Sequence, residues 1–176
     1  MNQPSNHLSF RECTLSDLDT LIQISKDTFI AAFEAENEPE DFREYIESAF
    51  SKEQLQKELL NQHSQFFFVF ENVDLVGYFK VNKDQAQTDV KDKDSLELER
   101  IYVVGHHQGK GIGAWMLQQV IDLAKDNGMD YVWLGVWEHN PGAIRFYQKY
   151  GFTKFGTHPY YIGDDQQTDW LLRLML

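Results

Sequence analysis

Apolar side chains recur at helical spacing in the first third of the chain. Leu18, Leu21 and Phe29 indicate the buried face of a first helix. Ser16 stands where the N-terminal cap of this helix is expected, and Ser51 caps a later helix at capping-box spacing. The predicted elements of this part are a strand over 8–11, the first helix, an acidic connection over 34–41 broken by Pro39, a helix near 42–50 and a helix that follows Ser51.

Apolar runs and turn residues divide the remainder of the chain. Phe66 to Phe70 is too short for a helix and predicts a buried strand, which pairs with the next strand as a hairpin. Gly128 and Gly151 end two later helices, and Asn140 followed by Pro141 begins the second of them. The predicted elements are strands over 66–70 and 75–81, a polar loop over 83–94, a strand over 96–104, a helix over 111–127, a strand over 131–137, a helix that ends at Gly151, and strands over 152–158 and 169–176 around a turn at 163–165.

This order of elements predicts an α/β (α+β) fold. The central strand–helix–strand unit predicts a parallel crossover, whereas the hairpins predict antiparallel pairs. We therefore expect a single mixed, mostly antiparallel sheet with helices on both faces. A chain of 176 residues of which 42% are hydrophobic suits a single domain over 1–176.

Charge and composition exclude several classes of function. The net charge of −12 gives no basic footprint for nucleic acid, and such a field attracts cations, including polyamines. No stretch approaches the roughly 20 apolar residues of a membrane span, and the polar residues 1–6 lack an apolar signal core. The single cysteine, Cys13, excludes an internal disulfide framework and predicts a buried thiol. We expect a cytoplasmic protein that binds neither nucleic acid nor membrane.

A glycine-rich loop, His106-His-Gln-Gly-Lys-Gly-Ile-Gly113, joins a predicted strand to a helix. Its glycines let backbone N–H groups approach a phosphate, and the helix N-terminus adds positive potential. The spacing of these glycines does not fit a nucleotide P-loop. Residues 109–114 do match the dinucleotide pattern G-x-G-x-x-A. The charged preceding strand, with Glu97, Glu99 and Arg100, and the short remaining chain argue against a dinucleotide fold.

Two motifs together resemble the GNAT family of N-acetyltransferases. Residues 108–113 match its Q/R-x-x-G-x-G/A signature for the diphosphate of coenzyme A. Residues 140–152 match its N-x-x-A-x-x-F-Y-x-x-x-G-F motif, in the expected order and at the expected strand–helix junction. The resemblance covers about 96–158 and implies the GNAT fold and acetyl-CoA as co-substrate.

The resemblance also implies which residues hold acetyl-CoA. In this family the pantetheine lies along the strand before the loop, which here implies Ile101, Tyr102 and Val103. A backbone N–H of this strand would serve as oxyanion donor. The residues implied to bind the diphosphate are Gln108, Gly109, Lys110, Gly111, Ile112 and Gly113. The resemblance implies that Asn140 bonds the pantetheine arm with Ala143 beside it, that Tyr147 also contacts the cofactor, and that Lys149 either reaches a phosphate or ends in solvent.

Acetyl transfer to an amine needs a base for the ammonium proton and benefits from an acid for the departing thiolate. Tyr147 matches the family's tyrosine that protonates sulfur; a core aromatic next to Phe146 is the alternative. Glu97 stands where histone-acetylating members have their base, and Glu99 shares its strand face. Solvated strand positions remain the alternative for both. We expect no metal.

The acceptor amine is the least determined part of the prediction. In the resembled family, the loop after the first helix and the last hairpin line the acceptor site, and here they carry Glu34, Asp164 and Asp169 among other carboxylates. The C-terminal third is similar to bacterial spermidine/spermine acetyltransferases of the PaiA type, which implies a small-molecule polyamine as partner. A protein N-terminus or lysine is the alternative acceptor, and a non-catalytic acetyl-CoA sensor the alternative of another class. A homodimer remains open.

Overall fold

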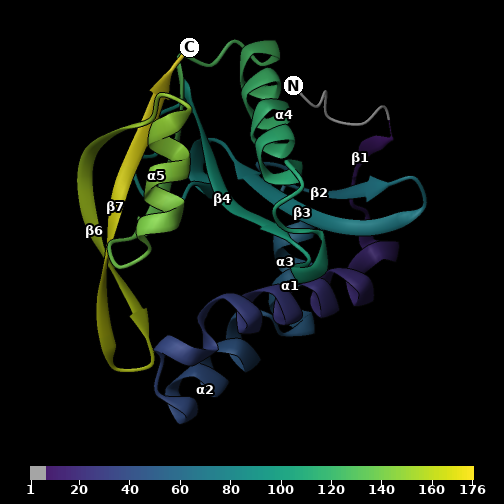
Figure 1. The fold of residues 1–176 in the computed structure, drawn as a ribbon, viewed down its shortest axis with the longest axis vertical. Helices are drawn as coiled ribbons and strands as arrows, with labels where there is room; N and C mark the ends of the chain where they lie inside the picture. Colours follow the sequence, from purple (N-terminus) through teal and green to yellow (C-terminus); the bar gives the residue numbers. More distant parts are fainter. Residues whose placement is uncertain (1–6) are drawn as a thin grey trace.

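A computed structural model of the protein describes residues 7–176, in which seven strands form one sheet in the order β1-β2-β3-β4-β5-β7-β6 (Figure 1). The strands are β1 (Leu8–Glu12), β2 (Ser64–Glu71), β3 (Asp74–Asn82), β4 (Ser95–Val103), β5 (Tyr131–Trp137), β6 (Thr153–Ile162) and β7 (Asp165–Met175). The helices are α1 (Leu18–Phe33), α2 (Pro39–Ala49), α3 (Lys52–Leu59), α4 (Ile112–Asp126) and α5 (Pro141–Lys149). The expected mixed sheet with helices on both faces is confirmed.

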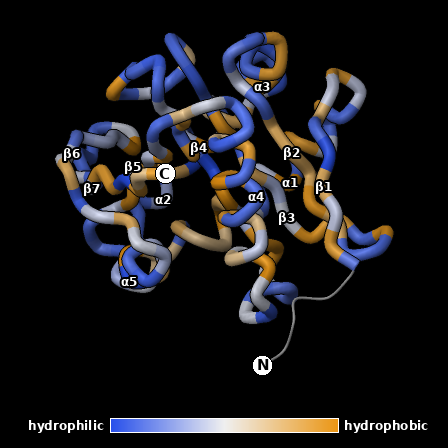
Figure 2. The backbone as a smooth tube through the Cα atoms, turned by 90° about the horizontal axis from the view of Figure 1, so that it is seen from above, coloured by the Kyte–Doolittle hydropathy of each residue, from blue (hydrophilic) through white to orange (hydrophobic). Residues whose placement is uncertain are grey.

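The sheet separates two hydrophobic cores. Phe66 and Phe68 pack with α1, α2 and α3 on one face, whereas Phe67 and Val69 pack with α4 and α5 on the other. Successive side chains of a strand point to opposite faces, so the continuous apolar run of β2 serves both cores. Figure 2 shows this run as a hydrophobic stretch within the sheet.

The parallel pair β4–β5 is short, and its early end creates a gap in the sheet. The two strands pair only from Ser95 opposite Tyr131 to Glu97 opposite Trp133, after which they diverge. Beyond Glu97, the edge of β4 that faces β5 therefore has no strand partner within the described residues. The same part of β4 contains a bulge, because Lys80 opposes Arg100 while Val81 opposes Leu98, which leaves Glu99 as the extra residue.

Two expectations about the first helices were wrong. Thr14 and Asp17, rather than Ser16, form the capping box, because a short 3₁₀ turn over Leu15–Asp17 precedes α1. The acidic stretch 34–41 is mostly helical, since Pro39 begins α2 at a position where its missing N–H costs nothing.

The remaining differences are small. Cys13 is buried as expected and follows directly after β1. The polar loop over 83–94 includes a 3₁₀ turn, and the strands of the final hairpin extend to Ile162 and from Asp165. Each helix within residues 7–176 is too short or too polar to cross a bilayer.

Candidate active site

A groove of about 650 Å³ lies over the N-terminus of α4, where the glycine-rich loop ends. Gly109 and Gly111 have φ angles of 76° and 83°, which glycine adopts without steric cost. Within the described part of the chain, the backbone N–H groups of Ile112, Gly113 and Ala114 meet no acceptor, as expected for the first turn of a helix. Together with the helix dipole, these donors suit an anion such as a diphosphate.

Most of the residues assigned to acetyl-CoA line this groove. They are Ile101, Tyr102, Val103, Gln108, Gly109, Gly111, Ile112, Gly113, Asn140, Ala143 and Lys149. Lys110 is exposed and lies outside the lining, and His107 lines the groove although sequence reasoning assigned it no role. Asn140 uses its side-chain oxygen to cap α5 by accepting the N–H of Ala143 at 3.2 Å, so its amide N–H₂ is the part left for a ligand.

The groove continues into a cavity of about 210 Å³ between the diverging ends of β4 and β5. The two share Ile101, Tyr102, Asn140 and Ala143 as lining residues. Tyr147 lines only the inner cavity, from α5. The cavity therefore brings Tyr147 close to the inner end of the groove.

Tyr147 is 8% exposed, and burial raises the pKa of its phenol above the ordinary value of 10. The phenol stays protonated at neutral pH and can donate a hydrogen bond or a proton into the cavity. Phe146 and Phe152 pack against its ring at centroid distances of 5.2 and 5.7 Å, so the ring is fixed within the aromatic core.

A second cavity of about 150 Å³ adjoins the first on the face of the sheet that carries α1 and α2. Phe29, Glu99 and Tyr160 are among the residues that line both cavities. Ile101 and Val103 pack in the core on the α4 side, whereas Phe29 and Tyr160 pack in the core on the α1 side. The continuous space thus passes through the sheet at the gap between β4 and β5.

Glu97 lines the second cavity and is only 2% exposed. Its carboxylate accepts hydrogen bonds from the Asn82 amide at 2.9 Å, the Thr88 N–H at 2.9 Å and the Thr88 hydroxyl. Burial, and then the charge of Glu99, raise the pKa of Glu97 above its ordinary value. Glu97 does not line the cavity that contains Tyr147.

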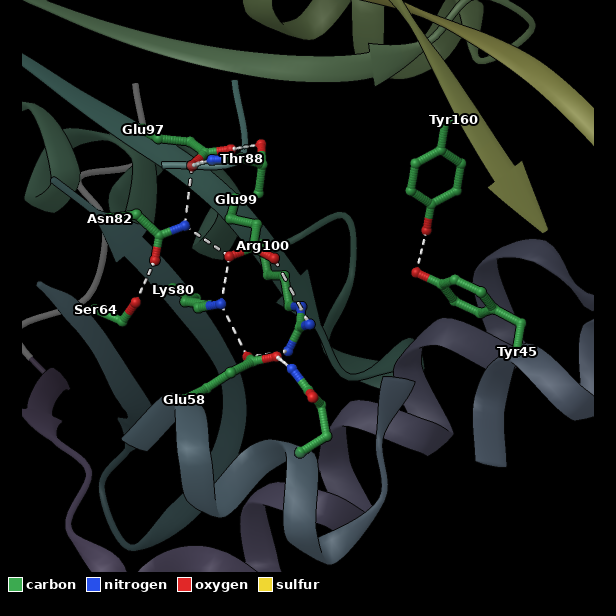
Figure 3. A network of polar contacts seen from close by, with 11 residues as sticks. Tyr45, Glu58, Ser64, Lys80, Asn82, Thr88, Glu97, Glu99, Arg100 and Tyr160 are labelled. Carbon is green, nitrogen blue, oxygen red and sulfur yellow. Dashed lines mark hydrogen bonds and ion pairs between the residues drawn. The ribbon is translucent and has the colours of Figure 1, made fainter. Parts of the chain in front are cut away.

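Glu99 belongs to a network of buried charges (Figure 3). It forms ion pairs with Lys80 and Arg100, and both cations also lie within 2.8 and 3.5 Å of Glu58. Burial opposes ionisation of Glu99, but Arg100 and Lys80 outweigh it and lower its pKa to about 2. The bulge in β4 places Glu99 beside Arg100 on one face, so one strand supplies both charges.

Asp169 was expected from the sequence only as one of several carboxylates of the last hairpin, with no role of its own. It projects from β7, opposite Trp137 of β5, and lines both cavities. Burial raises its pKa to about 6, while the nearby His158 opposes the rise. Its place in the acidic last hairpin was visible, but only the pairing of β7 with β5 brings it to the gap.

The predicted substrate residues Glu34 and Asp164 are exposed and line neither cavity. The segments that carry them nevertheless meet beside the second cavity. Tyr45 of α2 and Tyr160 of β6 share a hydroxyl hydrogen bond (Figure 3), and Gln167 of β7 donates to Asn37 at 2.9 Å. Within residues 7–176, no group of three or more His, Cys, Asp or Glu side chains is placed to hold a metal ion.

Comparisons with known proteins agree with this geometry. Residues 18–152 match the acetyltransferase (GNAT) family. An uncharacterised N-acetyltransferase of Lactobacillus delbrueckii subsp. lactis is 37% identical over 164 residues, which cover 91% of this chain and 92% of the relative.

Two solved structures share the fold. The PaiA N-acetyltransferase of Thermoplasma acidophilum in complex with coenzyme A is 21% identical, with a TM-score of 0.77 over 96% of this chain and 99% of that one. The spermidine N-acetyltransferase of Vibrio cholerae in complex with CoA and spermine is 19% identical, with a TM-score of 0.72 over 97% and 96%. The match over most of the chain, together with the groove at the first turn of α4, shows that the protein belongs to the acetyltransferase (GNAT) family and is an N-acetyltransferase.

Proposed function

We propose that the protein transfers the acetyl group of acetyl-CoA directly to a primary amine of a polyamine such as spermidine or spermine. The observation that carries the proposal is the carboxylate-lined space beyond the β4–β5 gap. Glu97, Glu99 and Asp169 all line it, and Glu58 adds a further carboxylate to the same network. Only Lys80 and Arg100 oppose them as permanent cations in that network, so the space favours an acceptor with several positive charges.

The two cavities form the proposed acceptor side, and their small size favours a slender acceptor molecule. Cavities of about 210 and 150 Å³ are small compared with the roughly 300–1,000 Å³ of pockets for drug-sized ligands. The contacts of Tyr45 with Tyr160 and of Asn37 with Gln167 join α1–α2 to the last hairpin over this side. An unbranched aliphatic amine fits such a space better than a folded protein segment does.

The roles of the groove follow from its chemistry. The first turn of α4 would hold the diphosphate, and the unpartnered edge of β4 at Ile101–Val103 would accompany the pantetheine arm. Tyr147 would protonate the departing sulfur, since its phenol is neutral and lies at the inner end of the groove. Glu34 and Asp164, being exposed, would contribute long-range attraction for a cation rather than direct contacts. The crystallised relatives with CoA and spermine support the same pair of reactants.

The test is the release of free thiol from acetyl-CoA over a panel of acceptors. We expect spermidine or spermine to give the highest kcat/KM, above aminoglycosides and lysine-containing peptides. Putrescine and butylamine form a matched pair that differs in one ammonium group. We expect butylamine to have a kcat/KM at least about tenfold lower, because it lacks the second charge for the carboxylates. A peptide or an aminoglycoside that exceeds both polyamines would overturn the proposed acceptor.

A further inference from the structure

Asp169 occupies the junction of the two cavities. Its side chain lies over Gly135 of β5, where a Cβ atom would stand 3.3 Å from its Oδ2. Glycine at this position therefore leaves space for the carboxylate. Asp169 of β7 and Tyr147 of α5 both line the inner cavity. A group in that cavity can contact both.

The other two carboxylates of the cavities are already occupied. Glu99 is paired with two cations, and its pKa of about 2 makes it a weak base. Glu97 accepts three hydrogen bonds from Asn82 and Thr88 and does not reach the inner cavity. In the described part of the chain, Asp169 accepts no hydrogen bond, so its lone pairs remain available to an acceptor amine.

His158 connects Asp169 to the protein surface. Its Nε2 lies 3.8 Å from Oδ2 of Asp169, a separation that a small side-chain movement reduces to hydrogen-bond distance. Its Nδ1 lies 2.9 Å from Oδ2 of Asp89. The N–H of Val90 and then His158 lower the pKa of Asp89, so Asp89 is a carboxylate and Nδ1 must donate to it. This bond turns Nε2 toward Asp169.

Exposure increases along this row of side chains, from the cavity outward. Asp169 is 15% exposed, His158 20% and Asp89 44%. Each side chain carries an oxygen or nitrogen atom that can accept a proton. The three side chains therefore form a row that leads from the inner cavity to solvent.

We infer that Asp169 takes the proton from the acceptor ammonium and that His158, held by Asp89, conducts this proton to solvent. The inference rests on the proposed transfer of acetyl to an amine. The N–H bond of the ammonium breaks and its proton moves to the Asp169 carboxylate, which frees the nitrogen lone pair for attack. The carboxyl proton then passes to Nε2 of His158, and the Nδ1 proton leaves by way of Asp89 and water. Exchange of protons with solvent at the two ring nitrogens then restores the Nδ1–H tautomer. One proton thus leaves for each amine made reactive.

The surroundings of Asp169 include charges that modulate this path. Glu97, Glu99, Arg100 and Tyr102 face the cavities from β4, and Tyr45 does so from α2. Tyr147 faces them from α5, and His158 and Tyr160 from β6. Burial is the larger influence on Asp169, and it keeps the pKa at about 6, close to the pH at which a base acts efficiently.

The test combines kinetics with a measurement that needs no acceptor. We expect Asp169→Asn to lower kcat/KM at about pH 7 by roughly a hundredfold and to abolish the acidic limb of the pH profile. We expect His158→Ala to lower it by about tenfold and added imidazole to restore part of the loss. The matched control is His139→Ala in an exposed loop, which should keep the rate and show no response to imidazole. The binding of CoA, followed by thermal shift, should stay unchanged in all three variants.

The titration of the Asp169 carboxyl, followed by ¹³C NMR without any amine, provides the independent measurement. We expect a pKa near 6 that rises in His158→Ala, because His158 lowers it in the wild type. Three results would each overturn the inference: full activity in Asp169→Asn, a His158→Ala defect that imidazole does not relieve, or a carboxyl that titrates near 3.8. Kinetics use whichever acceptor of the panel reacts fastest. If a peptide were the fastest acceptor, the polyamine proposal would be wrong, but the same variants would still test the proton path with that peptide.

Discussion

Tyr147 and Asp169 face one cavity, and burial raises the proton affinity of both groups. For the phenol, this shift keeps the group protonated over the whole physiological range. For the carboxyl, the shift to about 6 leaves a base that is ionised at neutral pH and still holds a proton strongly enough to accept one. The same physical cause thus prepares an acid and a base, because the two groups start from different intrinsic pKa values.

Replacement of Tyr147 by phenylalanine tests whether its hydroxyl acts as the proton donor. We expect kcat to fall at least about tenfold, because the ring still packs against Phe146 and Phe152 while the proton donor is gone. The dissociation constant of acetyl-CoA should change little, since Tyr147 does not line the groove over α4. Steady-state kinetics and calorimetry measure the two quantities. Tyr161→Phe, at an exposed tyrosine of β6, is the control, and an unchanged kcat in Tyr147→Phe would remove the residue from this role.

Asp169→Asn should also change stability, in a pH-dependent manner. The native pKa of about 6 exceeds the ordinary 3.8, so at pH values between the two the folded protein binds more protons than the unfolded protein does. The folded protein therefore loses stability as the pH rises through this range. Removal of the charge should raise the unfolding free energy at about pH 8 by roughly 1–2 kcal/mol, after allowance for solvent screening. The gain should shrink as the pH falls from about 6 toward 3.8. Urea unfolding at several pH values measures it, and a variant less stable than wild type at high pH would contradict the assignment.

Residue roles were only partly predictable from the sequence. Motif spacing led to Tyr147 and to the groove residues, because a helix or loop fixes near neighbours along the chain. Asp169 was expected only as one of the hairpin carboxylates near the acceptor, because its place at the gap depends on the insertion of β7 between β5 and β6. The state of Glu99 was equally hidden, because it depends on Lys80 of a neighbouring strand.

Among the elements, β4 combines three tasks within nine residues. Its first residues pair with β5, its bulge brings Glu99 beside Arg100, and its last residues line the groove. The charged pattern of this strand looked solvent-exposed in the sequence. In the fold its first four residues are buried, and Glu99 and Arg100 are half-buried and paired, so the charges of the strand did not exclude a central position in the sheet.

The junction between β4 and α4 depends on glycine at position 111. Gly111 adopts φ of 83° as the N-terminal cap of α4, a conformation that strains any residue with a Cβ atom. We expect Gly111→Ala to weaken CoA binding by about tenfold, because relief of a strain of about 1–2 kcal/mol turns the first N–H groups of the helix. Gly105→Ala is the matched control, since a Cβ there meets nothing within 4 Å and the φ angle is unstrained. Equal affinities for CoA in the two variants would contradict the role of Gly111.

Element positions were largely predictable where local signals were strong. Asn140 and Pro141 correctly predicted the start of α5, and Gly128 and Gly151 have the positive φ angles expected of residues that follow a helix. The start of α1 was missed, because Thr14 and Ser16 both offer cap oxygens and the partner Asp17 decided between them. Acidic residues with one proline resembled a loop at 34–41, although proline is equally suited to a first helical turn.

At the scale of the whole molecule, the acceptor side is assembled from segments that are far apart in the sequence. The α1–α2 region supplies Phe29 and Tyr45, while the last hairpin supplies Tyr160 and Asp169. Gly163 at the tip of this hairpin lies so close to Asp41 that a Cβ atom would stand 2.6 Å from its carboxyl carbon. The shape of the acceptor side therefore depends on how these two regions meet.

A double-mutant cycle on Tyr45→Phe and Tyr160→Phe measures this contact. Each single substitution removes the same hydroxyl hydrogen bond and should lower the unfolding free energy by about 1 kcal/mol. The double variant should lose little more, which gives a coupling energy of about 0.5–1 kcal/mol in denaturant unfolding. The control cycle pairs Tyr45→Phe with Tyr161→Phe and should be additive. Additive effects in the first cycle would show that the two hydroxyls act independently.

The gap between β4 and β5 leaves an opening through the sheet. The groove proposed for the coenzyme lies beside α4, and the cavity proposed for the amine lies beside α1 and the last hairpin. Under the proposed function the two reactants would occupy separate spaces, so neither would have to depart before the other binds. Kinetics of such an arrangement should show both reactants bound together, with lines that intersect rather than run parallel in a double-reciprocal plot.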